Sequence, residues 1–151
     1  MDYTLLCAQL HALAEADGWF VPLLSNASAL LYDAMEDVNW AGFYLMREGR
    51  LVLGPFQGKV ACIHILLGKG VCGTAAQRDE TQLVPDVHRF PGHIACDSAS
   101  NSEIVVPIHK HGKVVAVLDI DSPVLGRFTE ADRTGLEQFA RTIEEAMTDG
   151  E

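Results

Sequence analysis

The chain has 151 residues, 48% of them hydrophobic and 21% charged. This composition is typical of one globular domain with its own core and excludes a disordered chain. A net charge of −10 disfavours binding to nucleic acid and to anionic membranes. No apolar run approaches the roughly 20 residues that span a bilayer, and no basic signal region opens the chain, so we expect a cytoplasmic protein with reduced cysteines.

The first half of the chain is predicted to form two helices followed by three strands. Leucines at helical spacing predict a helix over residues 4–16, and Pro22 suits the first turn of a second helix that runs to Met35. The β-prone segments that follow are 39–46, 51–56 and 60–65, with a hairpin turn at Glu48-Gly49.

The second half is predicted to contain a short helix over 71–78, a strand over 81–84, a long loop over 85–102 and two strands over 103–108 and 113–120. A turn at His111-Gly112 joins the last two strands, and the hydroxyl of Thr129 caps a final helix that reaches about Met147. Helices at both ends and an antiparallel sheet of about six strands predict an α+β fold in a single domain over residues 1–151.

The loop over 85–102 is unusually long for a compact domain, which is typical of a segment that closes a binding pocket. It carries Cys96 between polar neighbours, where a thiolate can meet substrate and be stabilised by backbone N–H groups. A free cysteine is more often buried and inert, and that interpretation suits Cys7 on the first helix better than Cys96. We therefore predict that Cys96 is the reactive thiol.

Three carboxylates lie in or beside apolar strands, namely Glu103, Asp119 and Asp121. Strand alternation places Asp119 and Asp121 on one face, where their repulsion raises at least one pKa if the pocket is partly buried. Composition alone favours the plainer interpretation of two solvated surface acids at a strand end.

Metal and phosphate sites are weakly supported. No C-x-x-C or H-x-x-x-H spacing occurs among the residues that could bind a metal, which are Cys62, His64, Cys72, His88, His93 and Cys96. The glycines of residues 68–74 lack the G-x-x-x-x-G-K-[ST] pattern of a phosphate loop. We expect no bound metal and no cofactor.

Six strings in order go beyond these general signals: NWAGFYL (39–45), LGPFQGK (53–59), GKGVCGT (68–74), GHIACD (92–97), SNSEIV (100–105) and LDIDS (118–122). Together they resemble the free methionine-(R)-sulfoxide reductases, a family of stand-alone GAF domains. The resemblance runs from about Leu23 to the final helix, with no departure at a motif position.

The resemblance implies a GAF fold with a closed ligand pocket under a long loop, and reduction of free L-methionine-(R)-sulfoxide. It assigns Cys96 as nucleophile, Cys62 as the usual resolving thiol and Cys72 as a third thiol of less settled role. Its acids fall on Glu103, Asp119 and Asp121, and its aromatic walls on Trp40 and Tyr44. Backbone N–H groups around Ile94 and Ala95 are our expectation for the substrate carboxylate.

An intramolecular disulfide formed in such a reaction needs an external dithiol, for which thioredoxin is suited by its low potential. Spacing leaves open whether Cys62 or Cys72 resolves Cys96. Two other functions stay open as well: a GAF module that senses a small ligand, and a redox-sensing interaction protein that switches on a Cys62–Cys96 disulfide. A homodimer through edge strands or the N-terminal helices is compatible with the sequence.

Overall fold

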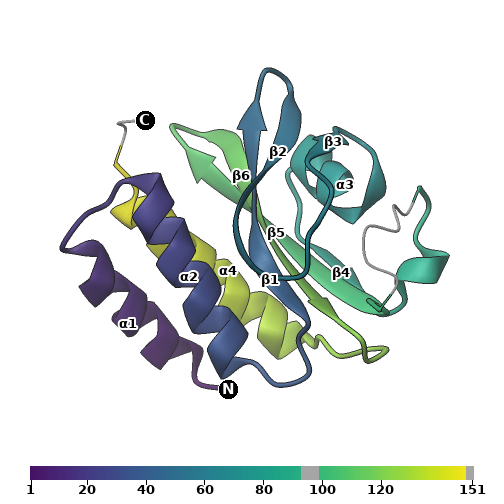
Figure 1. Cartoon of the computed structure of the whole chain (residues 1–151), viewed down its shortest axis with the longest axis horizontal. Coiled ribbons are helices and arrows are strands. Elements are labelled where there is room, and N and C mark those ends of the chain that lie inside the picture. Colours follow the sequence, from purple (N-terminus) through teal and green to yellow (C-terminus); the bar gives the residue numbers. More distant parts are fainter. Residues whose placement is uncertain (93–98, 149–151) are drawn as a thin grey trace.

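A computed structural model describes residues 1–92 and 99–148 of the chain. In this described part, six antiparallel strands form one sheet in the order β3-β2-β1-β6-β5-β4, accompanied by four α-helices and one 3₁₀ turn (Figure 1). The elements are α1 (Tyr3–Ala14), α2 (Phe20–Ala34), β1 (Trp40–Arg47), β2 (Arg50–Gly58), β3 (His64–Leu66), α3 (Gly70–Arg78), β4 (Gln82–Val84), η1 (Val87–Arg89), β5 (Ser102–Lys110), β6 (Lys113–Ser122) and α4 (Glu130–Ala146). The predicted α+β class and the six-stranded antiparallel sheet are confirmed.

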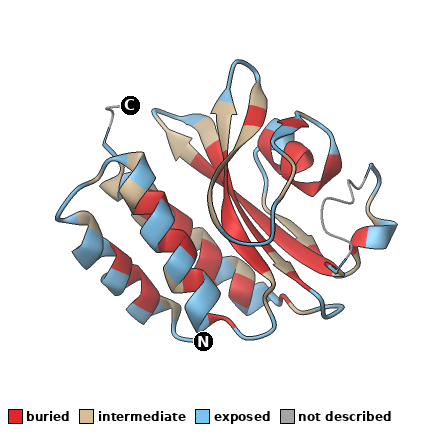
Figure 2. Ribbon diagram, in the orientation of Figure 1, coloured by how far each residue is buried: buried red, intermediate tan, exposed pale blue. Residues whose placement is uncertain are grey.

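The sheet separates two hydrophobic clusters. On one face, α2 and α4 cover the strands and α1 packs on the outside of these two helices; Leu136, Phe139 and Ile143 of α4 are fully buried there (Figures 1 and 2). On the other face, α3 and the connections around it cover a second cluster that includes Trp40, Tyr44, Val105 and Val117. Because side chains alternate along each strand, β1, β5 and β6 contribute to both clusters.

Helix α1 docks closely on α4. At Gly135 a Cβ would lie 2.0 Å from the Tyr3 ring, so the glycine allows this approach. The Tyr3 hydroxyl donates a hydrogen bond to Asp132 Oδ1 at 2.7 Å, and the other carboxylate oxygen accepts from the Thr129 backbone N–H at 2.9 Å. Thr129 and Asp132 form the two halves of a capping box, which confirms the predicted start of the last helix.

We expect Asp132→Asn to lower the free energy of unfolding by about 1–3 kcal/mol, since hydrogen bonds to a charged acceptor are lost. Burial alone would raise the pKa of Asp132, but its hydrogen bonds with Tyr3 and Thr129 and the charge of Arg127 outweigh burial and lower it below 3.8. A lowered folded-state pKa adds stability that is present above the unfolded pKa and lost as pH falls through the folded value. The difference between wild type and variant should therefore shrink below about pH 4 in denaturant titrations.

The matched control is Glu130→Gln in the same helical turn, where an exposed carboxylate pairs with Arg133 at 3.1 Å. Its effect should stay within about 0.5 kcal/mol. Equal losses in the two variants would contradict the role given to Asp132.

Two predicted elements differ from the structure. The segment 60–65 was expected to be a strand, but β3 begins only at His64, because pocket side chains bind the backbone carbonyls of Lys59 and Cys62. The loop expected over 85–102 contains the 3₁₀ turn Val87–Arg89, and its last residue, Ser102, already belongs to β5. None of the described helices is long and apolar enough to cross a bilayer.

Candidate active site

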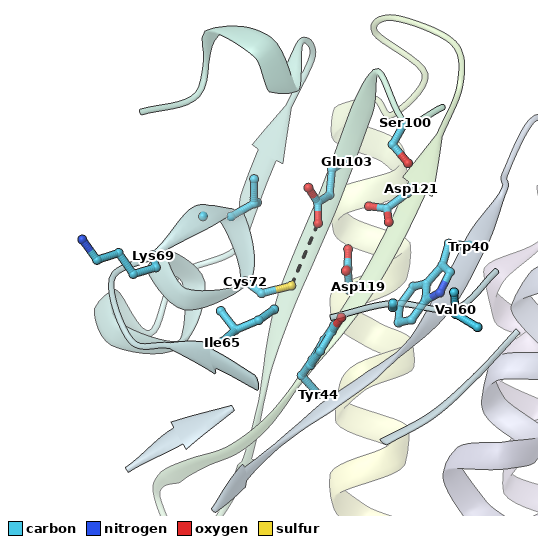
Figure 3. Close-up of a pocket in the computed structure, with 13 residues that line it drawn as sticks. Trp40, Tyr44, Val60, Ile65, Lys69, Cys72, Ser100, Glu103, Asp119 and Asp121 are labelled. Atoms are coloured by element: carbon cyan, nitrogen blue, oxygen red, sulfur yellow. Dashed lines mark hydrogen bonds between the residues drawn. The ribbon is translucent and has the colours of Figure 1, made fainter. Parts of the chain in front are cut away.

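A pocket lies on the sheet face opposite α1, α2 and α4. Its floor comes from β5 and β6, and its sides come from β1, α3 and the connection between β2 and β3 (Figure 3). The described residues that line it are Trp40, Tyr44, Val60, Ala61, Ile65, Lys69, Gly70, Val71, Cys72, Ser100, Glu103, Asp119 and Asp121. The structure thus gathers predicted residues from four distant segments of the chain.

The three predicted acids meet on the floor of this pocket (Figure 3). Glu103 on β5 is the direct cross-strand partner of Asp121 on β6, and Asp119 lies two residues before Asp121 on the same face. Glu103 is 8% exposed and Asp119 is 5% exposed. The interpretation as solvated surface acids is therefore wrong for Asp119, which is buried, whereas Asp121 is half-buried and lines the pocket.

Burial and mutual repulsion change how these acids ionise. Burial raises the pKa of Glu103 well above its usual range, and the negative charges of Asp119 and Asp121 raise it further. Burial also raises the pKa of Asp119. Three carboxyl groups so close together cannot all lose their protons in a poorly solvated pocket. The cluster therefore holds a proton to a higher pH than an isolated carboxyl group does.

The cluster lacks a cationic partner among the described lining residues. Lys69 is the one lysine or arginine there, and Figure 3 shows its side chain directed away from the carboxyl groups. Asp119 Oδ1 is buried and receives no hydrogen bond from any described residue. A buried, unsatisfied carboxyl oxygen is costly, so the pocket favours a bound cation or hydrogen-bond donor at this point.

Aromatic rings form the wall beside the acids. Trp40 stacks on Tyr44 with ring centroids 5.9 Å apart and on Phe56 at 5.1 Å. Phe56 lies opposite Gly42, where a Cβ would come within 2.2 Å of the Phe56 Cβ, so this glycine makes the stack possible. The wall offers a flat apolar surface next to a charged floor.

The same aromatic residues hold the covering segment in place. Trp40 Nε1 donates to the Lys59 carbonyl at 3.0 Å, and the Tyr44 hydroxyl donates to the Cys62 carbonyl at 3.1 Å. Burial raises the pKa of Tyr44, and the charge of Asp119 raises it further, so the hydroxyl remains a donor. These two bonds place Cys62 beside the pocket, although Cys62 does not itself line it.

Cys72 lies in the first turn of α3 with its side chain directed at the acids. Its Sγ is 3.9 Å from Glu103 Oε2, within reach of a weak hydrogen bond. Burial raises the pKa of Cys72 well above its usual value, and the charges of Asp119 and Glu103 add to this effect. Cys72 therefore remains a thiol rather than a thiolate at neutral pH.

The other cysteines have different surroundings. Cys7 is buried in the cluster beneath α1, α2 and α4, which confirms its prediction as a core residue. Cys62 is disulfide-bonded, whereas Cys7 and Cys72 carry free thiols. Cys96, Ile94 and Ala95 lie outside the described residues.

Sequence reasoning missed Ser100 on the pocket lining and Phe56 behind the aromatic wall, and it predicted none of the apolar lining residues of the 60–71 segment. Ser100, which accepts a hydrogen bond from Asn39 Nδ2 at 3.3 Å, was only part of a motif string. Phe56, which completes the aromatic stack, was likewise named only within a motif string. The strand pairing of Gly42 with Phe56 was the signal for the second, and it needs the register of β1 and β2.

Comparisons with known proteins give these features a context. The GAF domain family matches residues 4–147 of the chain. The free methionine-R-sulfoxide reductase of Escherichia coli is 52% identical over 145 residues, which are 96% of this chain and 88% of that protein. The enzyme of the same name from Saccharomyces cerevisiae is 53% identical over 146 residues, 91% of this chain and 81% of that protein.

A solved structure of fRMsr of Staphylococcus aureus in complex with substrate has the same fold, with a TM-score of 0.92 and 51% identity. The match covers 97% of this chain and 96% of that one. The fold is that of a GAF domain, and the chain belongs to this class of protein. Within this class, the chain belongs to the family of the free methionine-(R)-sulfoxide reductases, as its sequence motifs predicted.

Proposed function

We propose that this protein reduces free L-methionine-(R)-sulfoxide to methionine by thiol chemistry at Cys96. The observation that carries the proposal is the cluster of Glu103, Asp119 and Asp121 in the pocket, beside the wall of Trp40 and Tyr44. The pocket offers a proton donor, an anionic floor and an apolar wall within the reach of one small amino acid.

Each part of the substrate has a counterpart in the pocket. The ammonium group fits the anionic floor, where Asp119 Oδ1 receives no hydrogen bond from the described residues. The S-methyl group fits the faces of Trp40 and Tyr44, since thioethers and methyl groups pack well on aromatic rings. The carboxylate is assigned to backbone N–H groups near Ile94 and Ala95, outside the described residues. A peptide lacks the free ammonium and carboxylate, so this arrangement selects the free amino acid.

The reaction needs one acid and one nucleophile. A sulfoxide sulfur becomes electrophilic when its oxygen accepts a proton, and a carboxyl group with a raised pKa supplies one near neutral pH. Glu103 is our choice, because its pKa is raised well above the usual range. The Cys96 thiolate takes up the oxygen, which breaks the S–O bond of the substrate, releases methionine and leaves a sulfenic acid on Cys96.

The second half of the cycle forms a disulfide and one water when a resolving thiol condenses with the sulfenic acid. Cys62 suits this role better than Cys72. Cys62 is disulfide-bonded in this structure, and Tyr44 fixes its carbonyl beside the pocket. The raised pKa of Cys72 leaves it mostly protonated, and a protonated thiol is a poor nucleophile. Thioredoxin in the cytoplasm then reduces the disulfide, and no resident cofactor is needed.

The test compares three substrates: the free R epimer, the free S epimer and a peptide containing methionine-(R)-sulfoxide. With thioredoxin, thioredoxin reductase and NADPH, we expect NADPH oxidation with the free R epimer and a rate at least about 100-fold lower with the other two. Binding of the R epimer without turnover would instead indicate a ligand-sensing module. Equal turnover of the peptide would contradict the proposed recognition of both main-chain charges.

A further inference from the structure

Three atoms of the kinds that bind zinc converge in the pocket from three elements. They are Cys72 Sγ from α3 and a carboxyl oxygen each from Glu103 on β5 and Asp119 on β6, all within 4.8 Å of one another (Figure 3). All three residues are buried.

The spacing is close to that of ligands on one ion. Cys72 Sγ and Glu103 Oε2 are 3.9 Å apart. Tetrahedral zinc with a sulfur ligand at about 2.3 Å and an oxygen ligand at about 2.1 Å separates them by about 3.6 Å. A shift of a few tenths of an ångström in two side chains therefore makes this pair suitable for coordination.

The unsatisfied oxygen of Asp119 is a second and independent indication. Asp119 is 5% exposed, and its Oδ1 receives no hydrogen bond from the described part of the chain. The substrate ammonium satisfies this oxygen in the proposed reaction. A metal ion would satisfy the same oxygen, so the two would exclude each other.

We propose that Cys72, Glu103 and Asp119 bind a thiophilic divalent cation such as Zn²⁺, which inhibits the enzyme by occupying the place of the substrate ammonium. Zinc binding replaces the thiol proton of Cys72, which passes to the buffer as the S–Zn bond forms, and no electron is transferred. A thiolate ligand favours Zn²⁺ over Mg²⁺ and Ca²⁺, which prefer sites made of oxygen atoms alone. Three protein ligands leave the fourth position to water. The inhibition, though not the binding, rests on the proposed function.

The test uses the full chain without added reductant, so that the disulfide at Cys62 stays intact. Titration with Co²⁺ should produce the near-ultraviolet absorption band of a thiolate–cobalt bond at one equivalent. Zn²⁺ should abolish the band, and Mg²⁺ should not. Free methionine sulfoxide should weaken the apparent zinc affinity in proportion to its concentration.

Cys72→Ser and Asp119→Asn should each weaken zinc binding at least about tenfold, and Cys72→Ser should lose the cobalt band. Cys7→Ser is the matched control, because Cys7 is the other free thiol among the described residues and lies in the cluster on the opposite face of the sheet. It should keep both affinity and band. Circular dichroism of each variant confirms that it has folded.

A cobalt band that survives Cys72→Ser would overturn the site, and so would zinc binding that is unaffected by Asp119→Asn. Tight zinc binding with undiminished turnover would overturn the inhibition. A protein that binds zinc as expected but never reduces the sulfoxide, even without metal, would contradict the proposed function and leave the metal site standing.

Discussion

The Cys96→Ser variant should release no methionine from free methionine-(R)-sulfoxide, even in a single turnover with enzyme in excess. A serine hydroxyl is not ionised at neutral pH and cannot take up the substrate oxygen to form a sulfenic acid. The expected loss is roughly 10⁴-fold or more, as for the removal of a covalent nucleophile. Rapid mixing followed by amino-acid analysis measures the methionine released per enzyme, independently of any recycling system.

Cys62→Ser is the matched control, since it removes a thiol beside the pocket without removing the proposed nucleophile. It should release about one methionine per enzyme at nearly the wild-type rate and then turn over slowly with thioredoxin, because the sulfenic acid has lost its resolving partner. Full single-turnover release by Cys96→Ser would end the assignment of Cys96. An unchanged steady-state rate for Cys62→Ser would transfer the resolving role to Cys72 or to an external thiol.

Local signals in the sequence were sufficient for the helices and most strands. The capping box of Thr129 and Asp132 marks the start of α4, and Pro22 falls in the first turn of α2. Each of these signals depends on contacts within a few residues, so distant parts of the chain do not change its effect. The predicted strand over 60–65 was wrong, because Tyr44 binds the Cys62 carbonyl within this segment and Trp40 binds the Lys59 carbonyl just before it. No local pattern reports such contacts.

For the acid cluster, the sequence predicted the shared face of two residues but not their burial or their cross-strand partner. Strand alternation correctly placed Asp119 and Asp121 on one face, but their burial depends on α3 and on the segment that crosses above them. The partner of Glu103 depends on an irregularity in the β5–β6 hairpin. Lys110 pairs with Lys113 beside the turn. If the pairing continued from there without a bulge, Glu103 would lie opposite Ile120, and its side chain would point into the hydrophobic cluster under the helices.

The register shifts by one residue between Ile108 and His109, and this shift brings Glu103 opposite Asp121 instead. One residue of slip moves a whole strand segment to the other face of the sheet. The sequence shows the turn and the strands but not the bulge. The geometry of the acid cluster therefore becomes visible only in the structure, although the family motifs had named its members.

The Glu103→Gln variant should lose about 10²–10⁴-fold in the rate of methionine release, the usual contribution of a general acid. An amide keeps the size of the side chain but has no acidic proton to give. Because burial and the neighbouring acids raise the pKa of Glu103, the wild-type carboxyl keeps its proton to a higher pH than an ordinary glutamate, and the rate should fall as pH rises through that pKa. The variant should lack this alkaline decline.

Measuring the free energy of unfolding of Glu103→Gln distinguishes a loss of the proton donor from a folding defect. Glutamine removes one of two carboxyl groups that oppose each other across β5 and β6, so Glu103→Gln should unfold no more easily than wild type at neutral pH. Glu145→Gln, at an exposed position of α4, is the control and should match wild type in rate, pH profile and stability. A Glu103→Gln variant with the wild-type rate and alkaline decline would show that Glu103 is not the proton donor. The remaining candidates would then be Asp119 and Asp121, whose asparagine variants can be measured in the same assay.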